Sequence, residues 1–405
     1  MSRKLVFVLD IGTSKTVALS ACLDESGNVQ ILAISNVPSR GIAKGMIVDL
    51  DLAAGTVREA LTEIGYPGPT ADLVVAVNGS HLEGVNAQGF VPISPANRNI
   101  LPEDVLAVIN HSRQVSPSPD REQIMAIPRE FRVDDQKGIT RPLGLHGSRL
   151  EVVTHIITGK IATMQNLERT IEMAGGKVSM IMPAPMASAT AILNETAKEI
   201  GTAVIDLGAS TTGVTVFAKG AVVRICCLPV GGAHVTNDIM TLLKMTPQDA
   251  EKLKKDHGRA HTLGTKEESS VDVRQVGQSQ PRTMARKVLY EIIESRLKEI
   301  ATLVDQELLA SGYRKMLPGG ILLTGGASQL RGSAQLFAKV LGDSQIKAAS
   351  PYEQGPAGTH ANSAEYSCAV GLAKHFLSGR EDDLQPASGY QNWKEKILTL
   401  FQLKS

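Results

Sequence analysis

The chain has 405 residues, 42% of them hydrophobic, and a formal net charge of +1 at pH 7. This length suits two domains or one bilobed domain, and the near-neutral charge argues against nucleic acid as a partner. The four cysteines show no CxxC spacing, so we expect reduced thiols rather than disulfides or metal ligands. No window reaches the ~18–20 apolar residues of a membrane span, and the first apolar run is too short for a signal peptide, which predicts a cytosolic protein.

A strand–turn–strand pattern occurs twice. Residues 4–22, KLVFVLDIGTSKTVALSAC, and residues 202–218, TAVIDLGASTTGVTVFA, each read as an apolar strand, a small-residue turn and a second strand. We call these segments hairpin 1 and hairpin 2. Superimposing Asp10 on Asp206, 196 positions later, also aligns a glycine, a serine and a threonine. The repeat therefore predicts two similar lobes that face one another.

The chemistry expected of such turns is phosphate binding. Glycine lets the backbone approach an anion closely, successive N–H groups of the turn can point at it, and hydroxyls and a lysine add donors. Asp10 and Asp206 would repel phosphate directly, but they fit if each holds a hydrated Mg²⁺, which keeps most of its waters. Two tight hairpins with solvated aspartates remain the alternative. The predicted phosphate-binding residues are Gly12, Thr13, Ser14, Lys15, Gly208, Ala209, Ser210, Thr211 and Thr212.

A third motif follows an apolar strand in residues 319–332, GGILLTGGASQLRG. The four residues Gly325, Gly326, Ala327 and Ser328, here the GGAS turn, lead into a helix, and glycines at such a place let a flat ring or phosphate lie against the backbone. The chain contains no GxxxxGK[ST] and no GxGxxG, so neither a P-loop nor a Rossmann site is supported.

Two phosphate hairpins and a strand–GGAS–helix unit resemble the actin, sugar-kinase and Hsp70 ATPase superfamily. The resemblance implies an α/β fold with duplicated ribonuclease-H-like lobes and ATP with Mg²⁺ in the cleft between them. Further stretches are similar to the bacterial cell-division family FtsA in the family's order. They are residues 38–51 (PSRGIAKGMIVDLD), 127–152, 231–239 (GGAHVTNDI) and 249–260 (DAEKLKKDHGRA).

The FtsA resemblance implies an actin-like adaptor that self-assembles and tethers the ring protein FtsZ to the membrane. It places the protein at the division site, peripherally, on the cytoplasmic face of the bacterial inner membrane, where it recruits later division proteins through an inserted subdomain. The domains expected are 1–79 (first segment of the first lobe), 80–160 (inserted subdomain), 161–200 (second segment of the first lobe, with the connection between the lobes), 201–377 (second lobe), 378–389 (linker) and 390–405 (amphipathic helix).

Residues 280–309 show helical periodicity, with Val288, Ile292, Leu297, Ile300 and Leu303 roughly on one side. The basic residues of this segment are read most simply as a solvated face. The resemblance instead raises Arg282 and Arg296 as contacts for the C-terminal tail of FtsZ, and Arg286 as an adenosine contact beside the GGAS turn.

One position departs from the superfamily pattern. Its ATPases place Glu or Gln at the start of the segment between the lobes, where the side chain orients water near the terminal phosphate. Here that segment is MIMPAPMASATAIL (180–193), and the position aligns with Ala184. A methyl group cannot hold a water, and loss of a positioned polar group lowers rates by roughly 10²–10⁴. We therefore expect slow hydrolysis or none.

The last sixteen residues, YQNWKEKILTLFQLKS, follow a polar stretch at 378–389 that predicts a flexible linker. Apolar residues recur at helical spacing, and the segment carries a net charge of +2 from three lysines and one Glu. This pattern predicts a helix that lies in the surface of an anionic lipid membrane, with docking on the protein's own body as the alternative. The membrane-contacting residues expected are Trp393, Ile397, Leu400 and Phe401.

Two further functions stay open. A small-molecule kinase of the same superfamily would need an aspartate base in the cleft and would leave the terminal helix without a purpose. An actin-like adaptor of type IV pilus assembly shares the inserted subdomain, but it normally lacks the linker and the amphipathic tail.

Overall fold

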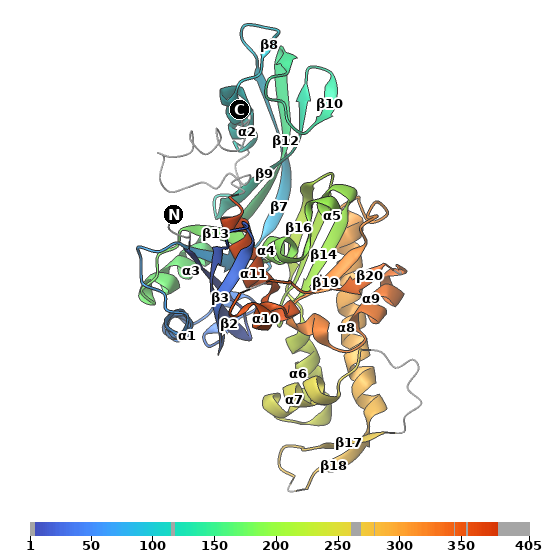
Figure 1. Ribbon diagram of the computed structural model, residues 1–405. Helices are drawn as coiled ribbons and strands as arrows, with labels where there is room; N and C mark the ends of the chain where they lie inside the picture. Colours follow the sequence, from blue (N-terminus) through green and yellow to red (C-terminus); the bar gives the residue numbers. More distant parts are fainter. Residues whose placement is uncertain are drawn as a thin grey trace.

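The computed structural model describes residues 5–114, 118–260, 269–278, 280–343, 345–353 and 355–379. Figure 1 shows two α/β lobes side by side, an elongated subdomain above them and a helical extension that ends in a small hairpin below. The predicted terminal helix and its membrane contacts Trp393, Ile397, Leu400 and Phe401 lie outside the described residues, as does most of the predicted linker.

The first lobe is built on a five-stranded sheet with the order β13-β6-β1-β2-β3. Helices α1 and α3 pack together beside it, and Asp49 caps α1 by accepting a hydrogen bond from the backbone N of Leu52 at 3.0 Å. The elements are β1 (Leu5–Ile11), β2 (Lys15–Leu23), β3 (Val29–Pro38), β4 (Ile42–Ala43), β5 (Met46–Ile47), α1 (Leu50–Glu63), β6 (Leu73–Val77), α3 (Ile161–Met173) and β13 (Met180–Pro183).

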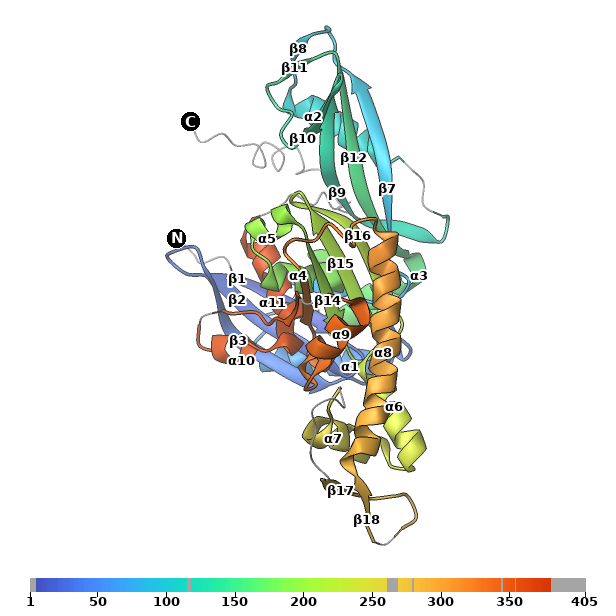
Figure 2. The same cartoon turned by 90° about the vertical axis from the view of Figure 1, so that its right-hand side faces the viewer.

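The second lobe repeats this arrangement in the strand order β16-β15-β14-β19-β20. Helix α8 runs along its outer side from the lower extension toward the upper subdomain (Figure 2). The elements are α5 (Glu195–Ile200), β14 (Thr202–Leu207), β15 (Thr212–Ala218), β16 (Ala221–Leu228), α8 (Arg286–Ala310), β19 (Ile321–Thr324), η1 (Gly326–Gln329), α9 (Ser333–Leu341) and β20 (Ile346–Ala348).

The two hairpins have the same register. Asp10 pairs with Val17 in hairpin 1, and Asp206 pairs with Gly213 in hairpin 2, so both partners are shifted by the same 196 positions. In each turn the glycine two residues after the aspartate donates its N–H to the carbonyl three residues on, at 3.0 and 2.9 Å. The duplication predicted from the sequence is confirmed at the level of individual backbone pairs.

Helices α4 (Ala184–Ile192) and α11 (Ser367–Leu377) lie between the two lobes. Helix α4 contacts β13 and β6 of the first lobe and β14, β15 and β16 of the second. At its crossing with α11, a Cβ on Gly371 would lie 1.7 Å from the carbonyl oxygen of Ala187, so the two backbones touch. The short segments α10 (Gly358–Ala361) and η2 (Ala364–Tyr366) precede α11.

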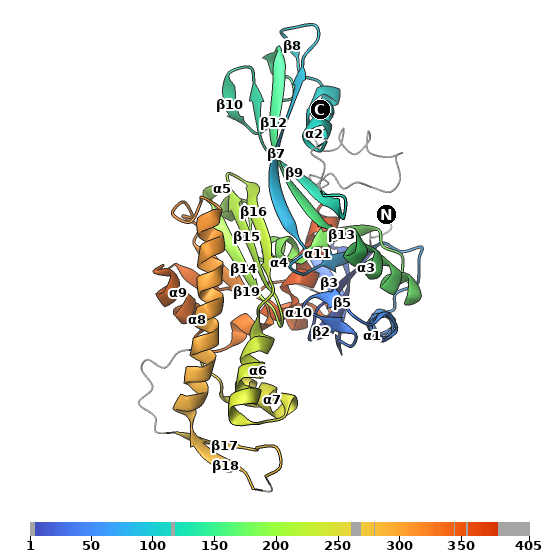
Figure 3. The ribbon, with the colours of Figure 1, turned by 180° about the vertical axis from the view of Figure 1, so that it is seen from behind.

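The upper subdomain is inserted between β6 and α3 (Figure 3). Helix α2 packs so closely on β7 that a Cβ on Gly89 would lie 2.4 Å from the carbonyl oxygen of Val108. One pair, Glu83 with Cys226, joins β7 to β16, so a nine-stranded sheet runs from the second lobe into the subdomain. The elements are β7 (Glu83–Pro92), β8 (Arg98–Asn99), α2 (Pro102–Ser112), β9 (Arg121–Val133), β10 (Gln136–Ile139), β11 (His146–Gly147) and β12 (Arg149–Lys160).

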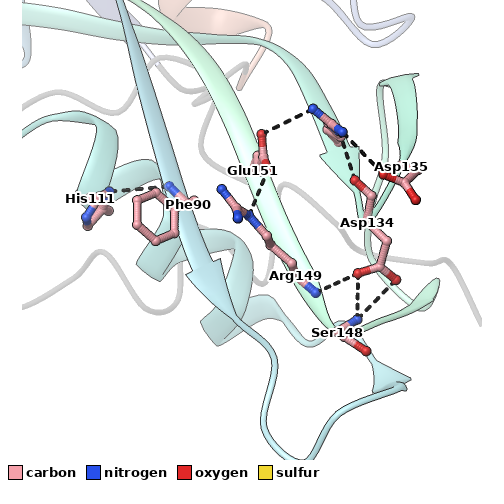
Figure 4. Close-up of polar contacts among 8 residues, drawn as sticks. Phe90, His111, Asp134, Asp135, Ser148, Arg149 and Glu151 are labelled. Atoms are coloured by element: carbon pink, nitrogen blue, oxygen red, sulfur yellow. Dashed lines mark hydrogen bonds and ion pairs between the residues drawn. The ribbon is translucent and has the colours of Figure 1, made fainter.

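Polar contacts tie the strands of the inserted subdomain together (Figure 4). The carboxylate of Asp134, a residue at φ +50°, accepts hydrogen bonds from the backbone N atoms of Ser148 and Arg149. The Arg149 guanidinium pairs with Glu151 at 2.8 Å and lies 4.9 Å from the centre of the Phe90 ring. Because Phe90 is 50% exposed, this face presents an aromatic ring with charged groups around it.

The structure of the lower extension differs from the helix predicted over residues 280–309. The helix expected over 280–309 begins at Arg286, because residues 282–285 form β18 (Arg282–Ala285), which pairs with β17 (Ser270–Val273). The predicted apolar side is confirmed at Leu297 and Ile300, which are buried. Val288 is instead 41% exposed, and Leu289 and Ile293 are buried. Pairing with the preceding strand outweighed helical periodicity here. Helices α6 (Gly232–Leu243) and α7 (Pro247–His257) complete the extension. Across the described ranges, no helix combines the length and apolar character needed to cross a membrane.

Candidate functional site

A cavity of about 760 Å³ opens between the lobes, within the ~300–1,000 Å³ typical of small-molecule sites. Hairpin 1 and hairpin 2 contribute their turns to its wall, the GGAS turn adds another portion, and α4 adds its first residue. The predicted residues that line the cavity are Asp10, Gly12, Thr13, Ser14, Lys15, Ala184, Asp206, Gly208, Ala209, Ser210, Thr211, Gly325, Gly326 and Ala327.

Three of the predicted nucleotide-binding residues do not line this cavity. The hydroxyl of Thr212 donates to the carbonyl of Val230 at 2.7 Å, and the hydroxyl of Ser328 donates to the carbonyl of Gly325 at 2.7 Å. Both side chains are buried and satisfy the backbone near the site. The third residue, Arg286, begins α8 and donates to the carbonyl of Ser270 at 3.3 Å, away from the GGAS turn.

The two glycines of the GGAS turn have different surroundings. Gly325 has φ +86°, and a Cβ there would lie 2.2 Å from Oδ1 of Asp206, so only glycine fits. A Cβ on Gly326 would meet only the Cβ of Glu365, at the ordinary distance of 3.6 Å. The first glycine therefore holds the turn against hairpin 2, and the second leaves an open backbone surface in the cavity wall.

The two hairpin aspartates line the cavity, where the charge of Lys15 acts on Asp10 but does not outweigh the effect of burial on its pKa. Burial raises the pKa of Asp10, and burial together with the charge of Asp10 raises the pKa of Asp206 to about 6. The Ser188 hydroxyl donates to Asp206 at 2.5 Å, which opposes this rise. A hydrated divalent cation between these carboxylates would relieve their repulsion. The described residues contain no group of three or more His, Cys, Asp or Glu that could hold a metal ion.

The cavity wall contains an ion pair that the sequence did not indicate. The Lys15 ammonium lies 2.5 Å from the Glu365 carboxylate and 4.2 Å from the centre of the Tyr366 ring. Burial lowers the pKa of Lys15, and Glu365 opposes that shift. Glu365 lies in η2, which contacts η1, so the pair links hairpin 1 to the GGAS turn. No local pattern in the sequence marks Glu365 for this role.

Helix α7 supplies a second charged group that sequence reasoning missed. Lys254 is buried, and its Nζ lies 2.6 Å from Glu251 and 3.0 Å from the carbonyl oxygen of Gly232. Burial alone would raise the pKa of Glu251, but the Lys254 ammonium holds it below its ordinary value. Both side chains and that of Lys255 line the cavity. The stretch DAEKLKKDHGRA contains them, but its charge pattern is that of any solvated helix.

Comparison with known proteins decides the family. A protein named "Cell division protein FtsA" from Pseudomonas aeruginosa is 31% identical over 408 residues, which cover 100% of this chain and 97% of that protein. The chain belongs to the FtsA family. The family model for cell division protein FtsA matches residues 203–371, and the model for the SHS2 domain inserted in FtsA matches residues 79–158. The Escherichia coli K12 FtsA is 34% identical over 391 residues, 94% of this chain and 92% of that protein.

Solved structures confirm the fold. The type IV pilus complex of PilM with PilN matches with a TM-score of 0.63 at 17% identity, over 92% of this chain and 98% of that chain. MreB5 of Spiroplasma citri, solved with ADP, matches with a TM-score of 0.54 at 14% identity, over 92% and 96%. This FtsA-family chain is therefore an actin-like cell-division protein, with the inserted subdomain predicted from its sequence.

The two arginines predicted to contact FtsZ are in different settings in this chain. Arg296 makes a two-pronged contact with Asp238, at 2.7 and 2.9 Å, and a third with Glu299 at 2.5 Å. Its charge is therefore already compensated, and it joins α8 to α6. Arg282 lies on β18 and is exposed. The predicted single helical face of basic residues is wrong, because only one of the two arginines is in the helix.

Proposed function

We propose that this protein binds ATP with Mg²⁺ in the cavity between its lobes. The observation that carries the proposal is the meeting of three predicted segments, hairpin 1, hairpin 2 and the GGAS turn, around one cavity. Their backbone N–H groups and hydroxyls suit phosphate oxygens, and the open backbone at Gly326 suits a flat ring. The fold is one in which a relative, MreB5, has been solved with ADP.

Each charged group has a distinct role in this proposal. Lys15 supplies positive charge to the phosphates. Asp10 and Asp206 would hold the hydration shell of Mg²⁺, and the cation would supply positive charge to the phosphates. Glu251 and Lys255, on the α7 side of the cavity, are suited to hydrogen-bond the sugar hydroxyls.

Gly326→Asp tests the nucleotide site. Its Cβ has room, so the variant should fold, but its carboxylate would enter the cavity wall where the nucleotide binds. We expect loss of binding in a fluorescent-nucleotide titration, and a much smaller loss for the matched variant Gly326→Ala. Gly325 is unsuitable for this test, because any side chain there would strike Asp206. Tight ATP binding by folded Gly326→Asp would overturn the proposed site.

We further propose that the protein self-assembles and links FtsZ to the cytoplasmic face of the inner membrane at the division site. Family membership supports the division role, and the sequence of residues 390–405 predicts an amphipathic helix with net positive charge. Exposed ion pairs contribute only ~0.2–1 kcal/mol each, so the tail of FtsZ should bind weakly and gain strength from many copies in a polymer. Later division proteins would bind the inserted subdomain, where exposed Phe90 offers an apolar contact.

Liposome co-sedimentation tests the membrane role. The full chain should sediment with anionic vesicles, while deletion of 390–405 or Trp393→Glu should leave it in the supernatant with ATP binding unchanged. Sedimentation of the truncated chain would show that the anchor lies elsewhere. Membrane release by these variants would also separate this function from a small-molecule kinase or a pilus adaptor, neither of which needs the tail.

A further inference from the structure

Asn78 joins the two lobes directly behind the phosphate hairpins. It follows the last residue of β6, is half-buried and lines the cavity. Its Nδ2 donates to Oγ1 of Thr211, in the turn of hairpin 2, at 3.1 Å, and its Oδ1 accepts from the thiol of Cys227 at 3.1 Å. Burial raises the pKa of Cys227 to about 12, which keeps the thiol protonated as a donor. The side-chain amide of Asn78, in the first lobe, thus contacts the second lobe at two places, the turn of hairpin 2 and strand β16.

The backbone of Asn78 also anchors the inserted subdomain. Its carbonyl oxygen accepts from Nε2 of His81 at 3.2 Å, and Nδ1 of the same ring accepts from the backbone N of Lys160 at 3.3 Å. Burial lowers the pKa of His81, in keeping with this neutral ring. Arg121 donates to the carbonyl of His81 at 2.6 Å and to the hydroxyl of Thr158 at 3.0 Å.

These residues occupy the place where three strands of the inserted subdomain leave the lobes. Strand β7 begins at Glu83, β9 begins at Arg121 and β12 ends at Lys160. We call this place the root. The side chains of Arg121 and Glu83 pair at 3.1 Å, and Glu83 is also the residue that pairs with Cys226 of the second lobe. Figure 2 shows β7 descending to β16 here.

We propose that Asn78 is a positioning residue that couples nucleotide binding to the inserted subdomain. The inference rests on the proposed nucleotide site and goes beyond it, because it links that site to a surface outside the cavity. The continuous contacts run from the Thr211 hydroxyl through the Asn78 side chain, and from the Asn78 backbone through His81 to Arg121 at the root.

The direction of the coupling follows from which group donates. Since Asn78 donates to the Thr211 oxygen, the Thr211 hydroxyl hydrogen can turn from the Cys227 sulfur, its neighbour here, toward a phosphate oxygen. When the Thr211 hydroxyl donates to a phosphate, its own oxygen becomes a better acceptor for the Asn78 amide. The hydrogen bond from Asn78 to Thr211 and the one from Thr211 to phosphate therefore strengthen one another. Bound nucleotide therefore holds Asn78 in place and tightens the root. By reciprocity, a root held in this position raises nucleotide affinity by the same factor.

Two substitutions at Asn78 separate the chemistry from simple loss of packing. In Asn78→Asp the carboxylate can only accept, so it competes with phosphate for the Thr211 hydroxyl hydrogen and adds a negative charge. In Asn78→Ala the contact is absent. We expect affinity for Mg·ATP about fivefold to tenfold weaker in Asn78→Ala, as for loss of one hydrogen bond, and weaker again in Asn78→Asp. In the Thr211→Val background, Asn78→Ala should have little further effect.

Hydrogen exchange on the full chain, with and without Mg·ATP, measures the coupling itself. In the wild type, nucleotide should slow exchange in hairpin 2 and also at the root, in residues 81–86, 121–125 and 156–160. In Asn78→Ala at saturating nucleotide, hairpin 2 should stay protected and the root should not. Asn36→Ala is the matched control, because Asn36 also lines the cavity but donates to the Tyr366 hydroxyl instead. It should keep the protection of the root.

The outcomes distinguish this inference from the function on which it rests. A wild-type chain that binds no nucleotide would overturn both. A wild-type chain that binds Mg·ATP without slower exchange at the root would overturn the coupling alone. The same conclusion would follow if Asn78→Ala, saturated with nucleotide, protected the root as the wild type does.

Discussion

The ammonium of Lys15 lies 2.5 Å from the carboxylate of Glu365, although 350 positions separate the two residues in the chain. The pair joins the turn of hairpin 1 to the segment beside the GGAS turn. A phosphate that enters the cavity must therefore compete with the Glu365 carboxylate for the Lys15 ammonium.

Removal of the Glu365 charge should strengthen nucleotide binding. In Glu365→Gln the competing anion is gone while the shape is kept, so affinity for ATP should rise by about 1.5-fold to fivefold, the range for a partly exposed ion pair. Glu59→Gln, at an exposed pair with Arg40, is the control and should change nothing. Calorimetric titration gives the answer, and weaker binding by Glu365→Gln would mean that the carboxylate holds Lys15 in its binding position.

Because of Asp206, the stability of the nucleotide-free protein and its affinity for a cation should change in opposite directions with pH. Its pKa of about 6 in the fold lies above the ordinary 3.8, so folding takes up a proton between these values. This contribution to stability is complete below the ordinary pKa and is lost as the pH rises through about 6. Asp206→Asn should therefore raise the melting temperature of nucleotide-free protein at about pH 7.5, with a smaller difference at about pH 5.

Binding of Mg·ATP should show the opposite trend, because the cation needs the charged carboxylate. Wild-type affinity should increase between about pH 5.5 and about pH 7.5, and the increase should be smaller in Asp206→Asn. Equal pH profiles for the two chains would show that Asp206 does not hold the cation.

Gly371→Ala should destabilise the protein more than any ordinary glycine substitution in a helix. Its methyl group would lie 1.7 Å from the carbonyl oxygen of Ala187, so α4 and α11 must separate. The expected loss in the free energy of unfolding is about 1–3 kcal/mol or more. Gly55→Ala in α1, where a Cβ would meet nothing within 4 Å, should instead add about 0.5–1 kcal/mol. Urea unfolding compares the two, and similar effects would contradict the close crossing.

Hydrolysis should be slow because Ala184 carries no polar group. Ala184 lines the cavity at the first position of α4. Ala184→Gln should accelerate phosphate release, while Ala184→Leu, of similar size without polar atoms, should not. Rapid release by the wild type that is lost in Asp10→Ala would place the water-orienting group at another residue.

Arg282 and Arg296 should respond differently to substitution. Arg282→Glu should weaken binding of an acidic FtsZ tail peptide without changing the melting temperature, because the side chain is exposed. Arg296→Gln leaves Asp238 without its two-pronged partner and should lower stability by about 1–2 kcal/mol. Peptide titration and thermal unfolding on both variants test this, and unchanged affinity in Arg282→Glu would place the peptide elsewhere.

Local patterns predicted those portions of the site that consist of consecutive residues. Hairpin 1, hairpin 2 and the GGAS turn can each be recognised within a short window, because glycine at a turn and an apolar strand before it are local requirements. The start of α8 was placed six residues too early, because residues 282–285 pair with β17 at residues 270–273 and do not continue the helix. Contacts such as Lys15 with Glu365 and Asn78 with Thr211 join residues 350 and 133 positions apart, and only the completed fold brings them together.

The crossing of α4 and α11 limits how the lobes can move. Where side chains interdigitate, two helices can slide by exchanging one set of ridges for the next. At Gly371 no side chain intervenes, and the carbonyl oxygen of Ala187 occupies the space of the missing methyl group. Translation along either axis would drive that oxygen into the flanking side chains, whereas swivelling about the contact point leaves it in place. The cavity should therefore open and close by rotation of one lobe relative to the other about the contact between Gly371 and Ala187. Glycine at position 371 fixes the centre of this rotation.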